Sequence, residues 1–414
     1  MPIQNTNRNT TWMLDQSNQT WTLTKNATIH VTDANGIYEA GHFGNEIKVL
    51  GDIVVKGLDA AVRFGGSDSS VLIGEDSRII SNETNYSNYA VHSEGAGSDI
   101  INRGLIQSGG HGIHGNIWND VENYGTIRAD IGMSFAGSGS QIYNYGLIDG
   151  KETAISSDAS GTHIENAKSG VIRSDDVAIR LENAGMAELV NKGILRGENA
   201  AIEVGSGQID ITNSGTIIGK VYMGDSADIF DSRKGVLKGT VFGGDGDDDY
   251  FVGQTSMRIS EGNGMDSGFD QVNSTVSYKL SANVESLTLL GTKDINATGS
   301  GGHNYMFGNN GDNKLSGLGG SDVLTAMGGN DILIGGAGQD TFVFNLTNGG
   351  VDRVTDFEDG MDLVTIVTID TQQEFDALDI KQVHGDLVIN LGGGDRIVIE
   401  DLLKSDFTFA DIGT

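Results

Sequence analysis

The sequence predicts an all-β fold, a right-handed parallel β-helix that runs into a β-roll. A nine-residue repeat runs without interruption over residues 299–343, and a looser repeat of 21–25 residues runs through the first 242. Proline is almost absent, with Pro2 alone among 414 residues, while short apolar runs alternate with turns rich in Gly, Asn, Asp and Ser. This pattern is typical of coils stacked one on another.

The longer repeat sets the first boundaries. Residues 1–46 precede it and are expected to cap the open edge of the first coil, and residues 47–242 are expected to form the β-helix. The repeated phrase is apolar-x-Asn-x-Gly-x-apolar. Its asparagines, which could hydrogen-bond in a ladder at one turn, are Asn102, Asn123, Asn144, Asn166, Asn191 and Asn213.

Two apolar columns give the register of these coils. The first lies two residues after the turn glycine and consists of Ile106, Ile127, Ile148, Ile172, Leu195, Ile217 and Leu237. The second consists of Val62, Val91, Ile113, Met133, Ile155, Ile179 and Ile202. Together with the apolar residues beside the asparagines they describe a coil with three faces, each contributing one inward column.

The residue after each member of the second column points outward. This outward row consists of Arg63, His92, His114, Ser134, Ser156, Arg180 and Glu203. Equivalent residues of neighbouring coils lie about 4.8 Å apart, so His92, His114 and Arg63 should be neighbours, with His111 close by. Such a group could bind an acidic sugar and move protons. A solvated row of polar residues is the simpler interpretation, and it is favoured.

Aromatic residues gather in the same coils and suggest a surface for sugar rings. They are Tyr86, Tyr89, Trp118, Tyr124, Tyr143 and Tyr145. Tyr124 and Tyr145 each follow a ladder asparagine, so both should face outward and stack on each other. With His114 expected nearby, these three are the candidate ligand-binding residues.

The nine-residue repeat points to a cation. Its fourth place is always glycine, its sixth is Asn or Asp, and its eighth is apolar. Glycine permits the left-handed turn that aims carbonyl groups at an ion, and a carboxylate supplies the hard oxygen that Ca²⁺ prefers. The sequence therefore predicts calcium as the cofactor. The candidate ligand positions are Asn304, Asn313, Gly320, Asp322, Gly329, Asp331, Gly338 and Asp340, with Gly246 and Asp248 in a separate copy at Gly243–Phe251.

This repeat resembles the RTX, or haemolysin-type, calcium-binding repeats of bacterial proteins exported by type I secretion. The run at Gly350–Ile366 is similar to the segment that follows such repeats, so residues 243–366 are expected to form the β-roll with a linking segment. Two nonapeptides make one coil in that family. The resemblance therefore implies that Asp322 pairs with Asp340, and Asp331 with Asn313. The neutral amides of Asn304 and Asn313 depart from the pattern, so sites there are expected to be weaker or empty.

The two ends of the sequence bear on whether and how the protein is exported. Residues 367–414 are expected to form a cap, and the run from Leu402 to Asp411 is similar to uncleaved C-terminal signals of type I substrates. The resemblance implies the type I secretion machinery as a partner and an extracellular location, with association at the cell surface as a further expectation. The N-terminus lacks a signal-peptide pattern, and no run approaches the roughly 20 apolar residues of a membrane helix, so no membrane insertion is expected.

The strongly acidic composition of the chain favours a cation as a ligand and disfavours nucleic acid as a partner. The chain has 57 acids and 26 bases; from Gly243 onward the counts are 28 and 8. Carboxylates crowded together repel one another unless a cation binds, so calcium is expected to order this half. Such acidity argues against nucleic acid. There is no cysteine, and hence no disulfide.

Two classes of function fit these observations. The favoured one is a secreted calcium-binding protein of the bacterial surface or matrix that binds a polysaccharide or cell-surface glycan through the β-helix, which resembles pectin-lyase-like solenoids and the repeat region of surface adhesins. The alternative is a polysaccharide lyase or epimerase with His92, His114 and Arg63 as its catalytic residues. An enzyme is less favoured, because the chain contains neither His-Glu-x-x-His nor Gly-x-Ser-x-Gly.

Overall fold

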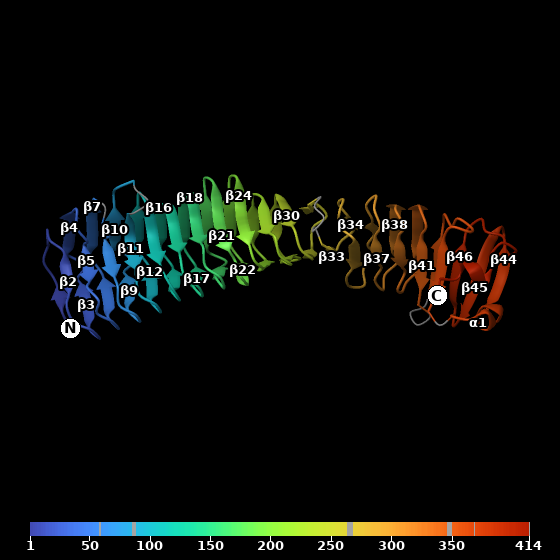
Figure 1. Ribbon diagram of the computed structural model, residues 1–414, viewed down its shortest axis with the longest axis horizontal. Helices are drawn as coiled ribbons and strands as arrows, with labels where there is room; N and C mark the ends of the chain where they lie inside the picture. Colours follow the sequence, from blue (N-terminus) through green and yellow to red (C-terminus); the bar gives the residue numbers. More distant parts are fainter. Residues whose placement is uncertain (58, 85–87, 263–267, 346–349, 368, 414) are drawn as a thin grey trace. The chain divides into compact units, whose positions relative to one another are not determined.

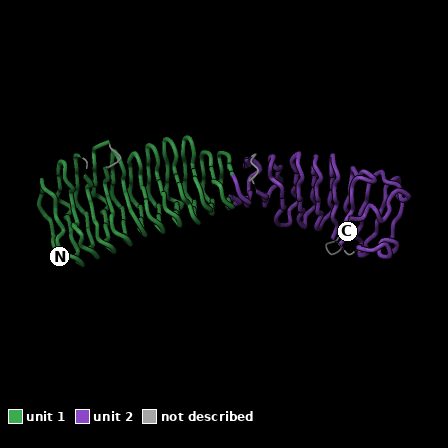
Figure 2. Tube along the Cα trace, in the orientation of Figure 1, with its two compact units in different colours: residues 1–230, 234–244 green, residues 231–233, 245–414 purple. Residues whose placement is uncertain are grey.

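The computed structural model describes residues 1–57, 59–84, 88–262, 268–345, 350–367 and 369–413. The chain divides into an N-terminal unit, residues 1–230 and 234–244, and a C-terminal unit, residues 231–233 and 245–414 (Figure 2). Both are built of parallel strands stacked coil on coil, so the predicted all-β solenoid is confirmed (Figure 1). Among the described residues, no helix is long and apolar enough to cross a membrane.

Each full coil of the N-terminal unit has three faces. The strands of the first face are β1 (Ile3–Gln4), β3 (Thr20–Leu23), β6 (Glu46–Val49), β9 (Ser70–Ile73), β12 (Asp99–Asn102), β15 (Asp120–Asn123), β17 (Gln141–Asn144), β19 (His163–Asn166), β22 (Ala187–Asn191), β25 (Ile209–Asn213) and β28 (Ile229–Ser232). Those of the second are β4 (Thr28–Thr32), β7 (Asp52–Lys56), β10 (Arg78–Ser81), β13 (Leu105–Ser108), β20 (Val171–Ser174), β23 (Ile194–Gly197), β26 (Thr216–Ile218) and β29 (Val236–Lys238).

The third face completes the coil. Its strands are β2 (Trp12–Leu14), β5 (Ile37–Glu39), β8 (Val62–Phe64), β11 (Tyr89–Ser93), β14 (His111–Gly115), β21 (Val177–Asn183), β24 (Ala200–Ser206), β27 (Val221–Gly224) and β30 (Thr240–Gly244). Two long strands, β16 (Thr126–Phe135) and β18 (Leu147–Ser157), span the second and third faces, with an irregularity in their pairing between Ala129 and Ile131.

Both predicted apolar columns occupy the core. Ile113 pairs with Val91 and Met133, and Ile127 with Ile106 and Ile148, and every member of both columns is buried. Burial of each such side chain contributes about 1.5–3 kcal/mol. The register read from the sequence is therefore confirmed.

The asparagine ladder is also confirmed. The Nδ2 of each ladder asparagine donates to the Oδ1 of the next, at 2.8–2.9 Å, from Asn102 through to Asn213, and all six side chains are buried. The turn glycine makes the stacking possible. A Cβ added at Gly146 would lie 2.1 Å from the carbonyl oxygen of Gly125, so only glycine lets consecutive turns approach this closely.

The segment expected to be a cap pairs in the same parallel way. β1 pairs with β3, β2 with β5 and β4 with β7. Trp12 and Trp21, both buried, pack edge to face with 5.8 Å between ring centroids. The first residues therefore extend the stack, and two large rings fill its first coils.

The C-terminal unit has two ladders in place of three faces. One contains β31 (Asp249–Val252), β33 (Gln271–Ser274), β35 (Ser286–Leu289), β37 (Tyr305–Phe307), β39 (Val323–Thr325), β41 (Thr341–Phe344) and β43 (Leu363–Ile366). The other contains β34 (Tyr278–Lys279), β36 (Ala297–Thr298), β38 (Lys314–Gly319), β40 (Ile332–Ala337), β42 (Val351–Val354), β46 (Asp395–Ile399), β45 (Asp386–Gly392) and β44 (Asp379–Val383). A further short strand is β32 (Arg258–Ser260).

Successive nonapeptides alternate between these two ladders. Leu324 pairs with Met306 and Phe342, each 18 positions away, while Leu315 pairs with Leu333 in the other ladder. All five eighth-place residues are buried. Two nonapeptides therefore make one coil, and apolar side chains from both sides fill its interior.

The last residues close the stack with antiparallel pairing. β44 and β45 form a hairpin, β45 pairs antiparallel with β46, and β46 joins the parallel ladder through β42. α1 (Gln372–Asp376) and the 3₁₀ turn η1 (Phe409–Asp411) flank them. In the run similar to an export signal, Leu402 and Phe407 are buried, and the Phe407 ring contacts those of Phe357 and Phe375.

Candidate functional site

The nonapeptide aspartates form two hydrogen-bonded columns. The Oδ1 of Asp322 accepts from the backbone N–H of Asn304 at 2.7 Å, and the Oδ1 of Asp340 accepts from that of Asp322 at 2.8 Å. On the opposite ladder the Oδ1 of Asp331 accepts from the N–H of Asn313 at 2.8 Å. Each carboxylate thus bridges to the preceding coil through one oxygen, and the fold brings the predicted pairs into adjacent coils.

The second oxygen of each aspartate has no protein partner. The Oδ2 atoms of Asp322, Asp331 and Asp340 are buried and accept no hydrogen bond in the described part of the chain. A buried carboxylate oxygen without a donor is costly unless a cation contacts it. The donor set of hard oxygens at tight turns therefore fits Ca²⁺.

The glycines of the turns have the conformation that this arrangement requires. Gly320, Gly329 and Gly338 have φ of +113°, +110° and +132°. A Cβ added at Gly338 would lie 1.7 Å from the carbonyl oxygen of Gly320. Any side chain would therefore fill the space where the turn carbonyls of adjacent coils approach each other.

Burial raises the pKa of these aspartates. It raises the pKa of Asp322 to about 6 and that of Asp331 to about 8, and it raises that of Asp340 as well. The hydrogen bond from the preceding coil's N–H opposes the rise in each case. Calcium must therefore compete with protons for these oxygens in the range from weakly acidic to neutral pH.

The stability of the C-terminal unit should therefore depend on pH, with opposite signs in the calcium-free and the calcium-bound states. Without calcium, the folded pKa values lie above the unfolded value near 3.9, so the folded state holds more protons and its stability falls as pH rises through about 6 to 8. In chelator we expect the C-terminal unit to show a thermal transition at pH 5, where protons replace the ion, and a lower midpoint or no transition at pH 8; with calcium the midpoint should be higher at pH 8. Differential scanning calorimetry at the two pH values measures both, and a higher midpoint in chelator at pH 8 would contradict the assignment.

The two asparagines of the repeat are satisfied within the protein. The Nδ2 of Asn304 donates to the carbonyl oxygen of Val284 at 2.9 Å, and that of Asn313 to the carbonyl oxygen of Ile295 at 2.7 Å. Their Oδ1 atoms accept from Ser300 and Asn309 backbone N–H groups. The amides therefore use the hydrogen-bonding capacity that the aspartates leave open.

The aspartate columns extend further than the nonapeptides indicate. The N–H of Asp340 donates to Asp362 at 2.9 Å, and that of Asp331 to Asp352 at 3.0 Å. Sequence reasoning missed these two residues as ligand candidates because their spacing is 22 and 21, which breaks the nine-residue period. The hydrogen-bonded column is the signal that identifies them.

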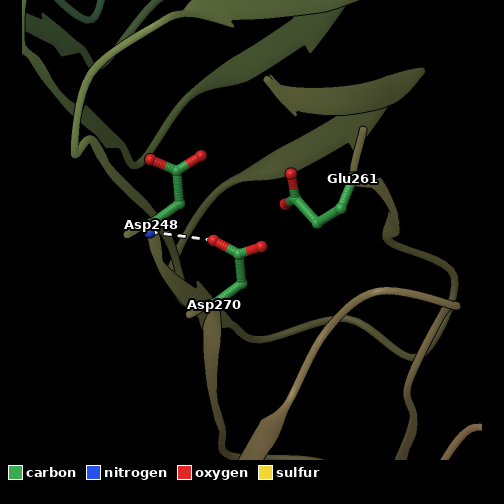
Figure 3. Close-up of side chains that lie close together, drawn as sticks. All are labelled: Asp248, Glu261 and Asp270. Atoms are coloured by element: carbon green, nitrogen blue, oxygen red, sulfur yellow. Dashed lines mark hydrogen bonds between the residues drawn. The ribbon is translucent and has the colours of Figure 1, made fainter. Parts of the chain in front are cut away.

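The separate copy places Asp248 beside two residues that the repeat does not contain. Gly246 has φ of +112°, like the other turn glycines, and the N–H of Asp248 donates to the Oδ1 of Asp270 at 2.9 Å. Glu261 lies on the other side of the same cluster (Figure 3). Neither Glu261 nor Asp270 was among the sequence candidates.

The outward row of the N-terminal unit has the predicted register. His92 pairs with Arg63 and His114, and His114 pairs with Ser134. Tyr89 lies among the histidines, with its ring centroid 4.5 Å from that of His92 and 4.9 Å from that of His114. We call Tyr89, His92, His111, His114 and Ser134 the histidine face.

Hydrogen bonds hold the histidine face together. The Ser134 Oγ lies 2.7 Å from the Nδ1 of His111 and 2.8 Å from that of His114. Burial lowers the pKa of His92 to about 4, with the charge of His114 as a second cause, and burial lowers the pKa of His114. Both rings are therefore neutral at pH 7.

Arg63, which lies beside the histidine face, forms an ion pair with Glu94. Its Nε and Nη2 both donate to the Oε1 of Glu94, at 3.1 and 2.5 Å. Glu94 was not among the sequence candidates, although it follows His92 by two residues and comes directly after β11. The guanidinium charge is thus already compensated.

The stacked tyrosines are present, but they do not share a surface with His114. The ring centroids of Tyr124 and Tyr145 lie 4.6 Å apart, and the ring planes are 4° from parallel. Tyr124 is 41% exposed and Tyr145 is 37% exposed. They follow β15 and β17 of the first face, whereas His114 lies in β14 of the third face. The three therefore do not form one group, because the turn after Gly115 and the strand β15 separate them, and a role for each in binding stays a prediction. Tyr86 lies outside the described residues.

The nonapeptides define a calcium-binding solenoid, and a comparison with known families identifies the repeat. Residues 307–342 match the model of the RTX calcium-binding nonapeptide repeat in four copies. The chain thus contains RTX calcium-binding nonapeptide repeats, whose cofactor is Ca²⁺, and such repeats indicate a secreted protein.

One solved structure is similar over part of its length. It is the crystal structure of the extracellular lipase LipA from Serratia marcescens, with 14% identity and a TM-score of 0.21. The match covers 52% of this chain and 41% of the lipase, so the chain spans less than half of that protein. No curated protein is significantly similar in sequence.

Proposed function

We propose that this protein is exported by type I secretion and binds a polysaccharide at the cell surface or in the surrounding matrix, without transforming it. Calcium-loaded nonapeptides stabilise the C-terminal unit, and the N-terminal unit presents the binding surface. The observation that carries the proposal is the exposed, stacked pair of Tyr124 and Tyr145.

The pair suits a sugar chain for two reasons. The exposed part of the two stacked rings offers an apolar surface to the C–H groups of a pyranose. The Arg103 guanidinium lies 4.8 Å from the Tyr124 ring centroid, and the Tyr124 hydroxyl donates to Glu122 at 2.8 Å. Charged hydrogen-bonding groups thus border the apolar surface. The two rings come from consecutive coils, so the surface lies along the direction in which the coils stack.

Removal of both rings should weaken binding. We expect Tyr124→Ala combined with Tyr145→Ala to reduce affinity roughly ten-fold or more, since stacking on each ring contributes about 0.5–1.5 kcal/mol. Proton NMR line broadening across a panel of neutral and acidic polysaccharides measures it.

A matched control lies in the same unit. Tyr222 stacks on Phe242 with 4.8 Å between centroids and an interplanar angle of 16°, so Tyr222→Ala also removes one stacked ring, but on a different face. This variant should retain the affinity of the unaltered protein. Equal binding by the Tyr124/Tyr145 double variant would refute the proposal.

The second candidate is a polysaccharide lyase or epimerase, and the histidine face is the observation that favours it. Proton transfer is most efficient when the pKa of the catalytic group lies near the working pH. The pKa of His92, about 4, lies well below neutrality, and Arg63 is paired with Glu94. These two facts favour a binding protein over an enzyme.

The enzyme alternative has a direct test on the sugar. We expect the proton spectra of the same polysaccharide panel to show no new unsaturated-uronate or inverted-sugar signals after incubation with calcium-loaded protein, because the pKa of His92 lies far below neutrality and Arg63 is paired with Glu94. Appearance of such signals, and their loss in His92→Ala or His114→Ala, would establish the enzyme instead.

A further inference from the structure

Three buried carboxylates meet in the C-terminal unit outside the run of nonapeptides. Asp248 immediately precedes β31, Glu261 immediately follows β32, and Asp270 immediately precedes β33. One oxygen of each lies within 4.8 Å of the others, and the residues are 1%, 8% and 0% exposed (Figure 3). Three separate chain segments thus direct acidic groups at one buried point.

One oxygen of this cluster has no partner. The Oδ1 of Asp270 accepts from the backbone N–H of Asp248 at 2.9 Å, and its buried Oδ2 accepts no hydrogen bond among the described residues. No Lys or Arg in that part of the chain pairs with Asp270. A fully buried carboxylate oxygen in this position requires a cation or a proton.

Tyr250 fixes the other two carboxylates. Its buried hydroxyl contacts the Oε1 of Glu261 and lies 3.2 Å from the Oδ2 of Asp248. The hydroxyl has one proton, so it can donate fully to only one of them. It holds both carboxylates in place without neutralising the negative charge of the cluster.

We propose that Asp248, Glu261 and Asp270 bind a calcium ion of their own. The site differs from the nonapeptide sites, since its acids are 13 and 22 residues from Asp248 instead of 18, and three carboxylates contribute. Calcium accepts six to eight oxygen ligands and binds more tightly as the ligand charge increases. A bound ion would join the ends of β31, β32 and β33. The proposal is independent of any polysaccharide.

Tyr250 provides a specific reporter. Terbium replaces calcium at oxygen sites and emits when a tyrosine close to the ion is excited. With the full chain, we expect tyrosine-sensitised terbium emission that excess calcium abolishes. Tyr250→Phe should lose this emission while the number of calcium ions bound per chain, measured by equilibrium dialysis, stays unchanged.

Variants separate this site from the nonapeptide sites and from proton sharing. Glu261→Gln keeps the shape of the side chain and should lose one calcium ion per chain together with the sensitised emission; Asp270→Asn should do the same. Asp322→Asn, the matched control, should keep the emission that depends on Tyr250. Unchanged emission in Tyr250→Phe, or unchanged calcium stoichiometry in both Glu261→Gln and Asp270→Asn, would overturn the proposal and leave three carboxyls that share protons.

Discussion

Removal of calcium is expected to unfold the C-terminal unit and to leave the N-terminal unit folded. The chain has 28 acids and 8 bases from Gly243 onward, and the Oδ2 atoms of Asp322, Asp331 and Asp340 are buried without a partner. Without a cation these groups must be desolvated and must repel one another, or take up protons. In the N-terminal unit the six ladder asparagines hydrogen-bond to one another, so these buried turns do not depend on an ion.

The free energy that bound calcium contributes is large enough for its removal to unfold the whole C-terminal unit. A ligand at 1,000 times its dissociation constant stabilises the folded state by about 4 kcal/mol per site. Two occupied sites therefore supply about 8 kcal/mol, which is comparable to the whole stability of a typical domain. Far-UV circular dichroism and limited proteolysis in chelator and in millimolar calcium measure the change. Identical spectra and identical cleavage in the two conditions would contradict it.

The second large effect is expected in the asparagine ladder. Asn144→Ala removes the acceptor of Asn123 Nδ2 and the donor to Asn166 Oδ1, at 2.8 and 2.9 Å. Each buried polar group left without a partner costs about 1–3 kcal/mol. We expect the N-terminal unit to lose roughly 2–4 kcal/mol, because the side chains of Asn123 and Asn166 remain buried and each loses one hydrogen-bond partner.

An exposed asparagine provides the control. Asn183 lies at the surface at the end of β21, and Asn183→Ala should change stability by no more than about 0.5 kcal/mol. Urea unfolding of the calcium-loaded chain, followed by tryptophan fluorescence, measures both variants, since all three tryptophans lie in the N-terminal unit. Equal midpoints for the two variants would show that the ladder contributes nothing.

Repetition explains how much of the fold was predictable. A column such as Val91, Ile113 and Met133 can be read from the sequence because each residue pairs with its equivalent one coil away. The same logic places Asp322 beside Asp340. It also gives the outward row, since a residue next to an inward one must point out.

What the sequence did not reveal lies where the period fails. Asp352 and Asp362 continue the aspartate columns across longer spacings, and Glu261 reaches Asp270 from a segment with no repeat. Tyr89 pairs with His111 in the register that the period gives, but the contacts of its ring with His92 and His114 depend on side-chain packing, which the period does not specify. The separation of Tyr124 from His114 depends on which face of the coil each occupies, and linear proximity does not give that.

Hydrogen exchange on the full chain, with and without calcium and resolved by segment, tests the central claim most directly. Amide protection reports local opening free energy. We expect chelation to abolish protection over residues 299–343 and to leave protection over β12, β15 and β17 unchanged. Undiminished protection of residues 299–343 in chelator would contradict the account, because the C-terminal coils would then be stable without the ion that their buried carboxylates require.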